Sequence, residues 1–203
     1  MNSSTLPHSA AADRNKEPIL ACLQAILAAH GNALEIASGT GQHVVWFAAA
    51  MQGWVWRPTD ADAQMLPVIA ERTAQSGLSN VLAPEQLDVM AASWPPLRDR
   101  FDAIYCANML HIAPWSACAG LMAGAARHLA PGGRLITYGP YLEHDVPVAP
   151  SNLAFDQSLR ARDPAWGIRQ LADVDAQARR CGLVRTQRHA MTSHNLLLLF
   201  ELA

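Results

Sequence analysis

Residues 34–43 read Leu-Glu-Ile-Ala-Ser-Gly-Thr-Gly-Gln-His. The apolar residues Leu34, Ile36 and Ala37 predict a short buried strand, and the apolar run 44–50 predicts a helix. The Ser-Gly-Thr-Gly between them predicts a tight turn. Two glycines separated by one residue let a ligand approach the backbone without meeting a Cβ, and the helix behind them offers unpaired N–H groups to an anion. A turn with no ligand would also explain this pattern, so its meaning depends on the residues that follow.

The same turn argues against two nucleotide-binding motifs. A dinucleotide-binding fingerprint has a third glycine three residues after the second, but that position is Val44. A phosphate-binding loop has Gly-Lys followed by Ser or Thr, and the turn contains no lysine. A nicotinamide-dependent oxidoreductase is therefore a weaker alternative.

Composition predicts a soluble, cytoplasmic globular protein. The 203 residues are 51% apolar, which suits a single domain over residues 13–203 after a small, polar and flexible arm over residues 1–12. A net charge of −2 gives no electrostatic argument for a nucleic-acid partner. The four cysteines are scattered and no metal site is expected. No secretory signal is evident, and no apolar run reaches the roughly 18 residues that span a membrane.

Strands and helices alternate along the chain, which predicts an α/β fold with mostly parallel strands. The apolar stripe from Ile19 to Leu27 predicts a helix that begins near Asp13 and stops at Gly31. Two closing strands joined by a short turn predict an antiparallel hairpin. The further expected strands are 54–60, 81–87, 101–108, 134–138, 183–189 and 195–202, and the further expected helices are 63–75, 114–129, 152–160 and 171–181.

Asp60 ends the second expected strand, about twenty residues after the glycine turn. At this separation a doubly wound sheet places a carboxylate to accept hydrogen bonds from ribose hydroxyls. Asp62 is a competing candidate, but it is better placed to cap the following helix.

Glu35, inside the strand and before Gly-x-Gly, resembles motif I of the class I S-adenosylmethionine-dependent methyltransferases. Asp60, Asp88, the segment 108–115 after the fourth strand, and Leu-x-Pro-Gly-Gly at 129–133 stand where that class has its motifs. The resemblance implies a doubly wound, mostly parallel seven-stranded sheet with an antiparallel C-terminal hairpin. It also implies S-adenosyl-L-methionine as the cofactor and S-adenosyl-L-homocysteine as its product.

A closer resemblance covers nearly all of residues 12–202. As a set, several long motifs are similar to the methyltransferase-like family called domain of unknown function 938, to which methyltransferase-like protein 26 belongs. This family implies S-adenosylmethionine binding but fixes no acceptor. The motifs are Arg14–Leu20, Glu35–His43, Asn108–Trp115, Tyr138–Tyr141, Ser151-Asn152, Phe155-Asp156, Ser158–Arg160 and Asp163–Arg169.

The resemblance assigns a cofactor-binding set. The glycine turn would hold the methionine portion of the cofactor. Arg14, Asn15 or Lys16 would bind the methionine carboxylate. These three residues would equally suit a solvated helix start. Asp60 would hold the ribose and Asp88 the adenine amine, with Val89 or Met90 packing on the ring, although Asp88 would also serve as a helix cap. The complete set is Arg14, Asn15, Glu35, Ala37, Gly39, Gly41, Asp60, Asp88, Val89 and Asn108.

The acceptor side is less well defined. His111 follows the fourth strand and is the first candidate for a general base. A structural hydrogen-bonding role would also suit His111. The other candidates for a general base are Tyr138, Tyr141 and His144. Residues 139–169 lose their periodicity, which favours a functional loop. The candidate substrate-binding residues in that loop are Asn152, Asp156, Arg160, Trp166 and Arg169.

Two readings of the acceptor side remain open. Arg160 and Arg169 could bind the substrate, or they could instead pair with the acids of the loop, Asp156 and Asp163.

From the resemblance as a whole we predict an S-adenosylmethionine-dependent methyltransferase that transfers a methyl group to a small-molecule acceptor by in-line displacement. The alternative is a catalytically silent S-adenosylmethionine-binding protein. The oligomeric state stays open.

Overall fold

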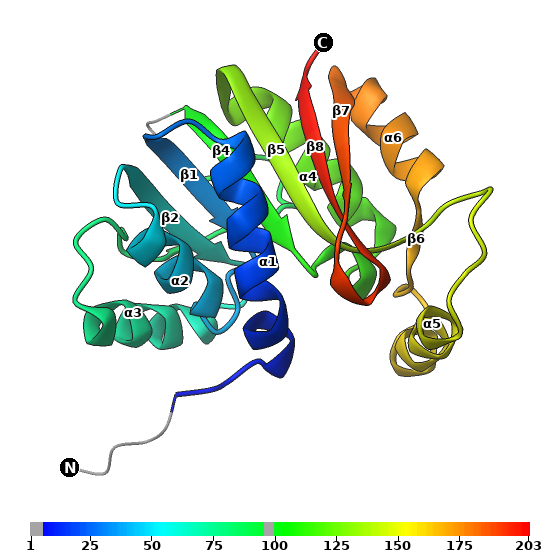
Figure 1. Cartoon of the computed structure of the whole chain (residues 1–203), viewed down its shortest axis with the longest axis horizontal. Coiled ribbons are helices and arrows are strands. Elements are labelled where there is room, and N and C mark those ends of the chain that lie inside the picture. Colours follow the sequence, from blue (N-terminus) through cyan, green and yellow to red (C-terminus); the bar gives the residue numbers. More distant parts are fainter. Residues whose placement is uncertain (1–5, 96–99) are drawn as a thin grey trace. The chain divides into compact units, whose positions relative to one another are not determined.

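The computed structural model describes residues 6–95 and 100–203 (Figure 1). Their contacts form two compact units, one within residues 1–88 and the other within residues 89–203. The predicted single domain over 13–203 and the flexible arm over 1–12 stay predictions, and residues 1–5 of that arm lie outside the described residues. Within the described ranges, no helix combines the length and apolar character needed to cross a membrane.

The first unit is built on parallel strands. β2 lies between β1 and β3, with Gly31 of β1 opposite Trp54 of β2. α2 contacts both α1 and α3. In chain order, the described elements of this unit are α1 (Ala10–Ile26), β1 (Gly31–Ile36), α2 (Gln42–Ala50), β2 (Trp54–Asp60), α3 (Met65–Ser76) and β3 (Glu85–Gln86).

α1 begins three residues before the expected start. Ser9 is its N-cap, and the Ser9 hydroxyl accepts a hydrogen bond from the backbone N–H of Ala12 at 3.2 Å. This bond satisfies one of the free N–H groups of the first turn, which explains why the helix starts at Ala10.

The third strand is shorter than predicted. Residues 81–87 were expected to form it, but only Glu85 and Gln86 do so, and Val81 forms an isolated bridge with Trp56. Pro84 lies between the two pairings and has no N–H to donate to a ladder. The interruption therefore has a local cause that strand periodicity does not detect.

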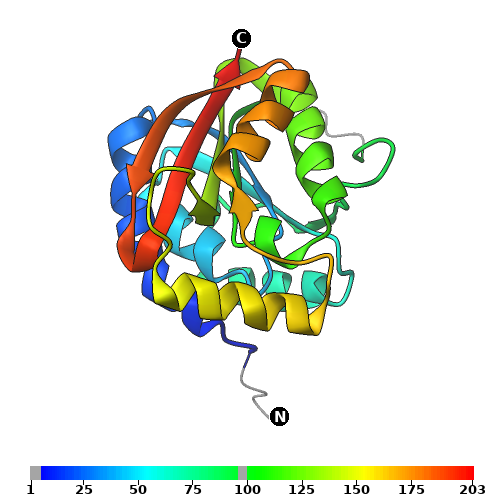
Figure 2. The same ribbon diagram turned by 90° about the vertical axis from the view of Figure 1, so that its right-hand side faces the viewer.

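The second unit combines parallel and antiparallel strands, and with the parallel first unit it confirms the predicted α/β fold class. β4 is parallel to β5, whereas β8 is antiparallel to both β5 and β7. α4 and α6 lie side by side (Figure 2). The elements are β4 (Phe101–Ala107), η1 (Leu110–Ile112), α4 (Trp115–His128), β5 (Leu129–Leu142), α5 (Pro150–Arg162), β6 (Arg169–Gln170), α6 (Leu171–Arg180), β7 (Leu183–Ala190), η2 (Thr192–His194) and β8 (Asn195–Leu202).

β5 is longer than the expected strand 134–138. It includes Pro131-Gly132-Gly133, which was predicted to be a turn before the strand, and it continues through the Gly139-Pro140 pair to Leu142. The register with β4 jumps between Leu129 and Arg134, and Gly132 has a φ of 76°. The extra residues are accommodated as an irregularity in the strand, where glycine tolerates the positive φ.

The expected loop over residues 139–169 is largely structured. Its first residues continue β5, and its centre is α5, which is longer than the predicted helix 152–160. Pro150 supplies a fixed φ at the start of α5, as proline commonly does in the first turn of a helix. Leu159 is the buried residue of α5, so most of this helix faces outward.

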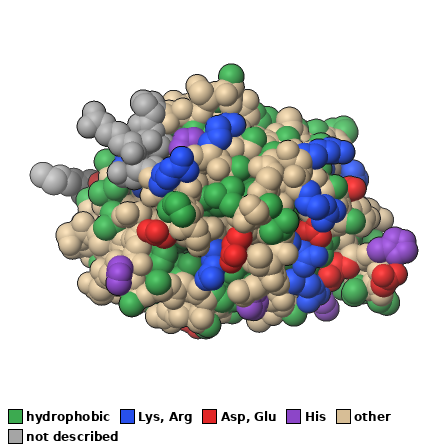
Figure 3. Space-filling model, turned by 90° about the horizontal axis from the view of Figure 1, so that it is seen from above, with side chains coloured by type: hydrophobic (Ala, Val, Ile, Leu, Met, Phe, Trp, Pro, Cys, Tyr) green, Lys and Arg blue, Asp and Glu red, His purple; other side chains and the backbone are tan. Residues whose placement is uncertain are grey.

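Charged side chains of both signs share the face shown in Figure 3, where the described Lys and Arg side chains lie among Asp and Glu side chains. The whole sequence has 15 Lys and Arg residues and 17 Asp and Glu residues. The expectation that nucleic acid is not a partner stays a prediction.

Candidate functional site

In the first unit, the glycine turn joins β1 to the N-terminus of α2. Gly41 is the N-cap of α2, with a φ of 71°, and a Cβ there would lie 3.3 Å from the Cα of Ile69 on α3. Gly39 also has a positive φ, of 55°, but a Cβ there would meet nothing within 4 Å. Gly41 is therefore required by packing against α3, whereas the space beside Gly39 is open to a ligand.

The Asp60 carboxylate fastens this turn to the end of β2. Its Oδ2 accepts a hydrogen bond from the backbone N–H of Gly39 at 2.8 Å, and its Oδ1 accepts one from Asp62 at 3.0 Å. Ser38 adds two bonds to the backbone of Thr59, of 2.8 and 3.1 Å. A carboxylate has about four lone-pair sites, so Asp60 retains acceptor capacity after these two bonds. Its side chain is nevertheless 9% exposed, so access to it is narrow.

Glu35 lies beneath the turn as a buried acid. It is 2% exposed, and burial raises its pKa from 4.5 to about 8, with the neighbouring Asp60 charge adding to the effect and a hydrogen bond to Ser38 opposing it. Glu35 is therefore largely protonated at neutral pH. Its Oε2 is a buried atom without a hydrogen-bond partner. Such an atom is costly unless water or a ligand donor reaches it.

The predicted carboxylate-binding residues of α1 differ in their surroundings. Arg14 is exposed, whereas Asn15 is 6% exposed and its Oδ1 lies 2.7 Å from Nε2 of His43. Lys16 lies over the Trp46 ring at 4.4 Å and pairs with Asp13. Asn15 and Lys16 thus have structural partners, and Arg14 is the most accessible of the three.

Sequence reasoning assigned no binding role to His43, Gln42 or Arg72. His43 is 7% exposed, and burial lowers its pKa from 6.5 to about 4, so its ring is neutral near pH 7. Gln42 exchanges hydrogen bonds with the backbone of Ser9, and Arg72 donates to the carbonyls of Pro7 and Thr40. These residues tie the start of the described chain to the glycine turn. The signal available in the sequence was a polar pair, Gln42-His43, at the start of an apolar helix.

In the second unit, the chain leaves β4 through Asn108 into η1. Asn108 has a φ of 58°, and its backbone N–H donates to the Tyr138 carbonyl at 2.8 Å. His111, in η1, is 6% exposed, and its ring meets the Phe155 ring edge-on at 5.5 Å. Burial, with a smaller contribution from the Arg169 charge, lowers the pKa of His111 from 6.5 to about 4. A Cβ at Gly139 would lie 3.4 Å from His111 Nδ1, so the ring packs closely on β5.

Arg169 holds the η1 segment in place. Its guanidinium donates to the carbonyls of Leu110, Ala113 and Ala165. The backbone N–H of Gly167 also donates to the His111 carbonyl at 3.0 Å. The alternative pairing of Arg160 with Asp156 is confirmed at 2.8 Å, whereas Arg169 binds backbone carbonyls instead of the Asp163 carboxylate that the sequence suggested.

The two tyrosines of β5 have intramolecular hydrogen bonds. Tyr141 is buried, its hydroxyl donates to Thr137 Oγ1 at 2.8 Å, and burial raises its pKa far above the ordinary value. The Tyr138 hydroxyl accepts from Asn195 Nδ2 at 3.0 Å. Neither arrangement favours a base at neutral pH, so His111 is a more suitable candidate than either tyrosine.

The remaining predicted residues belong to the segment after β3, to α5 and to the chain that follows α5. Asp88 is exposed and Val89 is buried. Asp156 Oδ1 accepts from the backbone N–H of Ile168 at 2.6 Å, and Trp166 stacks with Arg162 at 5.7 Å. Asn152 lines a cavity of its own unit.

Comparison with known proteins places these features in a family and a fold. The sequence model of a family described as "Protein of unknown function (DUF938)" matches residues 6–202. A solved O-methyltransferase family 2 protein from Planctomyces limnophilus, in complex with apigenin, is similar with a TM-score of 0.74 and 19% identity, over 93% of this chain and 62% of that chain.

Two further solved structures are similar. The S-adenosylmethionine-dependent methyltransferase SibL, in its apo form, has a TM-score of 0.77 and 20% identity, over 94% of this chain and 55% of that chain. CalO1, a methyltransferase in calicheamicin biosynthesis, was solved in its SAH-bound form. It has a TM-score of 0.74 and 15% identity, over 93% of this chain and 54% of that chain. This chain thus spans just over half of the length of those chains. At these identities the likeness concerns the fold, and it confirms the predicted class I methyltransferase fold.

Proposed function

Because the chain belongs to the DUF938 family of proteins of unknown function and has a methyltransferase fold, we propose that it is an S-adenosylmethionine-dependent methyltransferase with a small-molecule acceptor. The observation that carries the proposal is the glycine turn between β1 and α2, fastened at Gly39 to the Asp60 carboxylate at the end of β2. The helix N-terminus behind the turn suits a ligand carboxylate. The glycine backbone lets the ligand approach closely, and the Asp60 carboxylate suits a ribose.

The residues of the first unit fit S-adenosylmethionine. The open side of Gly39 admits a ligand next to the backbone, and the buried Oε2 of Glu35 lacks a partner that a water or an ammonium group would supply. Asp60 has lone pairs left for ribose hydroxyls. Arg14 is available for the methionine carboxylate, with Asn15 positioned beside it by His43. Asp88 and the backbone at Ala37 and Gly41 keep the cofactor roles predicted for them, and the roles of Val89 and Asn108, which belong to the second unit, stay predictions.

When bound, S-adenosylmethionine supplies an electrophilic methyl group on a sulfonium. Transfer then requires the protein to align an acceptor and to exclude water, and it requires a base only if the acceptor loses a proton. With a pKa of about 4, the His111 ring is unprotonated at neutral pH and can accept a hydrogen bond from an acceptor hydroxyl. We assign it this role, with Arg169 positioning it through the carbonyls of η1.

Binding calorimetry tests the proposal with S-adenosylmethionine, S-adenosylhomocysteine and NAD. We expect the first two to bind and NAD not to bind. Asp60→Asn should weaken S-adenosylhomocysteine binding by about 1–3 kcal/mol, because charge-assisted hydrogen bonds to the ribose are lost while an oxygen remains for Gly39. Asp62→Asn, at an exposed neighbouring carboxylate, is the matched control and should leave the affinity unchanged.

Three outcomes would count against parts of the proposal. Binding of NAD alone would refute it. Equal affinities for the wild type and Asp60→Asn would remove Asp60 from the site. Tight cofactor binding with no methyl transfer in a labelled-methyl screen of small-molecule extracts would favour the catalytically silent protein.

A further inference from the structure

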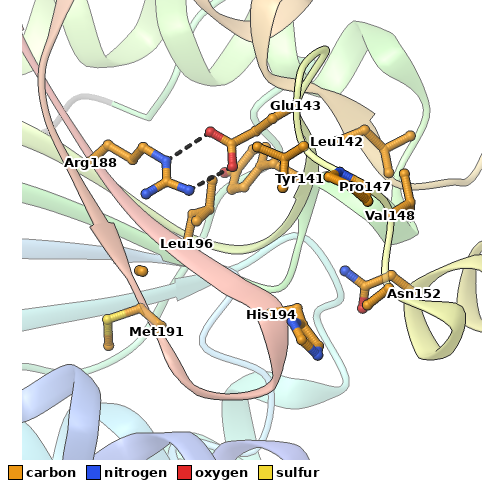
Figure 4. A pocket seen from close by; sticks show the side chains of 13 residues that line it. Tyr141, Leu142, Glu143, Pro147, Val148, Asn152, Arg188, Met191, His194 and Leu196 are labelled. Carbon is orange, nitrogen blue, oxygen red and sulfur yellow. Dashed lines mark hydrogen bonds and ion pairs between the residues drawn. The ribbon is translucent and has the colours of Figure 1, made fainter.

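A cavity of about 190 Å³ lies within the second unit. Three segments line it, namely the end of β5 with the chain that follows it, the start of α5, and the turn between β7 and β8 (Figure 4). Asn152, which the sequence predicted as a substrate-binding residue, is part of its lining. No role has yet been given to this space.

The cavity has two polar sides. On one side, Arg188 donates to both oxygens of Glu143, at 2.8 and 2.6 Å, and this pairing lowers the pKa of Glu143 and raises that of Arg188. Figure 4 shows Asn152 and His194 away from this ion pair, at the other end of the labelled residues. The charges of Glu143 and Arg188 are thus already matched, whereas Asn152 offers an amide that can both donate and accept.

The rest of the lining is mainly apolar. A charged ligand would have to give up its hydration against these side chains and compete with an ion pair that is already formed, both of which oppose binding. An uncharged ligand meets neither cost. The apolar lining residues are Leu142, Val146, Pro147, Val148, Ala149, Ala190, Met191 and Leu196.

We infer that this cavity binds a small uncharged molecule of about one ring that carries a hydroxyl or amide group. The size follows from the volume, because a protein cavity of about 150 Å³ can hold benzene. The hydroxyl or amide group of the ligand would form a hydrogen bond with the Asn152 amide.

Binding of four one-ring probes tests the ligand class. Benzyl alcohol and benzamide are uncharged, benzoate is an anion, and benzylamine is a cation at neutral pH. Chemical-shift titrations of the full chain should show the two uncharged probes binding at least tenfold more tightly than the charged ones, with shifts confined to the lining residues. Tighter binding of benzoate or benzylammonium, or no binding of any probe, would overturn the proposed ligand class.

Cavity variants locate the probe. Ala190→Leu places extra volume in the lining and should weaken benzyl alcohol binding at least tenfold, whereas Thr186→Leu, on the same strand but outside the lining, should not. Ala190 and Thr186 are both exposed, so neither change disturbs the core. Asn152→Ala should weaken binding about threefold to tenfold through loss of one hydrogen bond. Equal effects of Ala190→Leu and Thr186→Leu would place the probe elsewhere.

Discussion

Ala37, the first residue after β1, has a φ of 55° although it carries a Cβ. This left-handed conformation costs a residue other than glycine about 1–2 kcal/mol. Asn108, the first residue after β4, has a similar φ of 58°. Asparagine adopts this region more readily than alanine, so the strain concerns Ala37, where β1 leads into a segment proposed to bind a ligand, and such strain commonly lies at functional sites.

We predict that Ala37→Gly leaves the free energy of unfolding unchanged or raises it by up to about 1 kcal/mol, because relief of strain offsets the added freedom of the unfolded chain. Ala107→Gly is the matched control, since Ala107 is also half-buried at the end of a parallel strand but has no positive φ. That control should lose about 0.5–1 kcal/mol. Chemical denaturation measures the free energy of unfolding of both variants. If Ala37→Gly and Ala107→Gly lower it by the same amount, Ala37 is not strained.

At the scale of elements, the segment after β4 depends on a contact from far along the chain. Arg169 begins β6, yet it binds carbonyls at both ends of η1, whose residues lie more than fifty positions earlier. Its charge also helps to lower the pKa of His111. One side chain therefore connects the order of η1 to the protonation of the candidate acceptor-binding residue.

Arg169→Gln should lower the free energy of unfolding by about 2 kcal/mol, because bonds from a charged donor to backbone carbonyls are lost. Hydrogen exchange at the Gly167 amide, which donates to His111, should become faster, and the pKa of His111 measured by NMR titration should rise. Arg179→Gln, at an exposed position on α6, is the control and should change none of these quantities. If the His111 pKa in Arg169→Gln equals that in the wild type, the Arg169 charge does not affect the protonation of His111.

At the scale of the whole molecule, three buried groups determine how stability depends on pH near neutrality. His43 and His111 have pKa values lowered from 6.5 to about 4, and Glu35 has a pKa raised from 4.5 to about 8. Between pH 4.5 and 6.5 the unfolded chain binds protons at both histidines, whereas the folded chain binds one at Glu35, so stability rises with pH. Above pH 6.5 the proton that Glu35 binds in the folded chain outweighs the protons that the unfolded histidines still bind, and stability falls until about pH 8.

We therefore predict a maximum of stability near pH 6.5 and a loss of about 1 kcal/mol by pH 8. Glu35→Gln removes the titrating group and should abolish the loss above pH 6.5, while Glu17→Gln, at an exposed acid on α1, should retain it. Urea denaturation at several pH values measures the effect. A wild-type stability that does not fall between pH 6.5 and 8 would show that Glu35 is ionised in the folded protein.

Local pattern was sufficient for much of the fold. The glycine turn, the order of helices and strands, and the antiparallel end of the sheet follow from hydrophobic periodicity and turn residues, which act over a few positions. The placement of Asp60 beside the turn also followed, because the carboxyl ends of parallel strands share an edge. The sequence determined these features because each depends on neighbouring residues or on a general rule of strand order.

Only the tertiary structure decided the features that depend on distant residues. Asn15 meets His43 across 28 positions, and Arg169 reaches η1 instead of Asp163. The high pKa of Glu35 and the hidden hydroxyl of Tyr141 arise from burial, which is a property of the packed molecule. The cavity beside Asn152 is likewise lined by segments from three parts of the second unit. Long-range packing sets which polar groups lose water and which keep it, and composition and spacing do not contain that information.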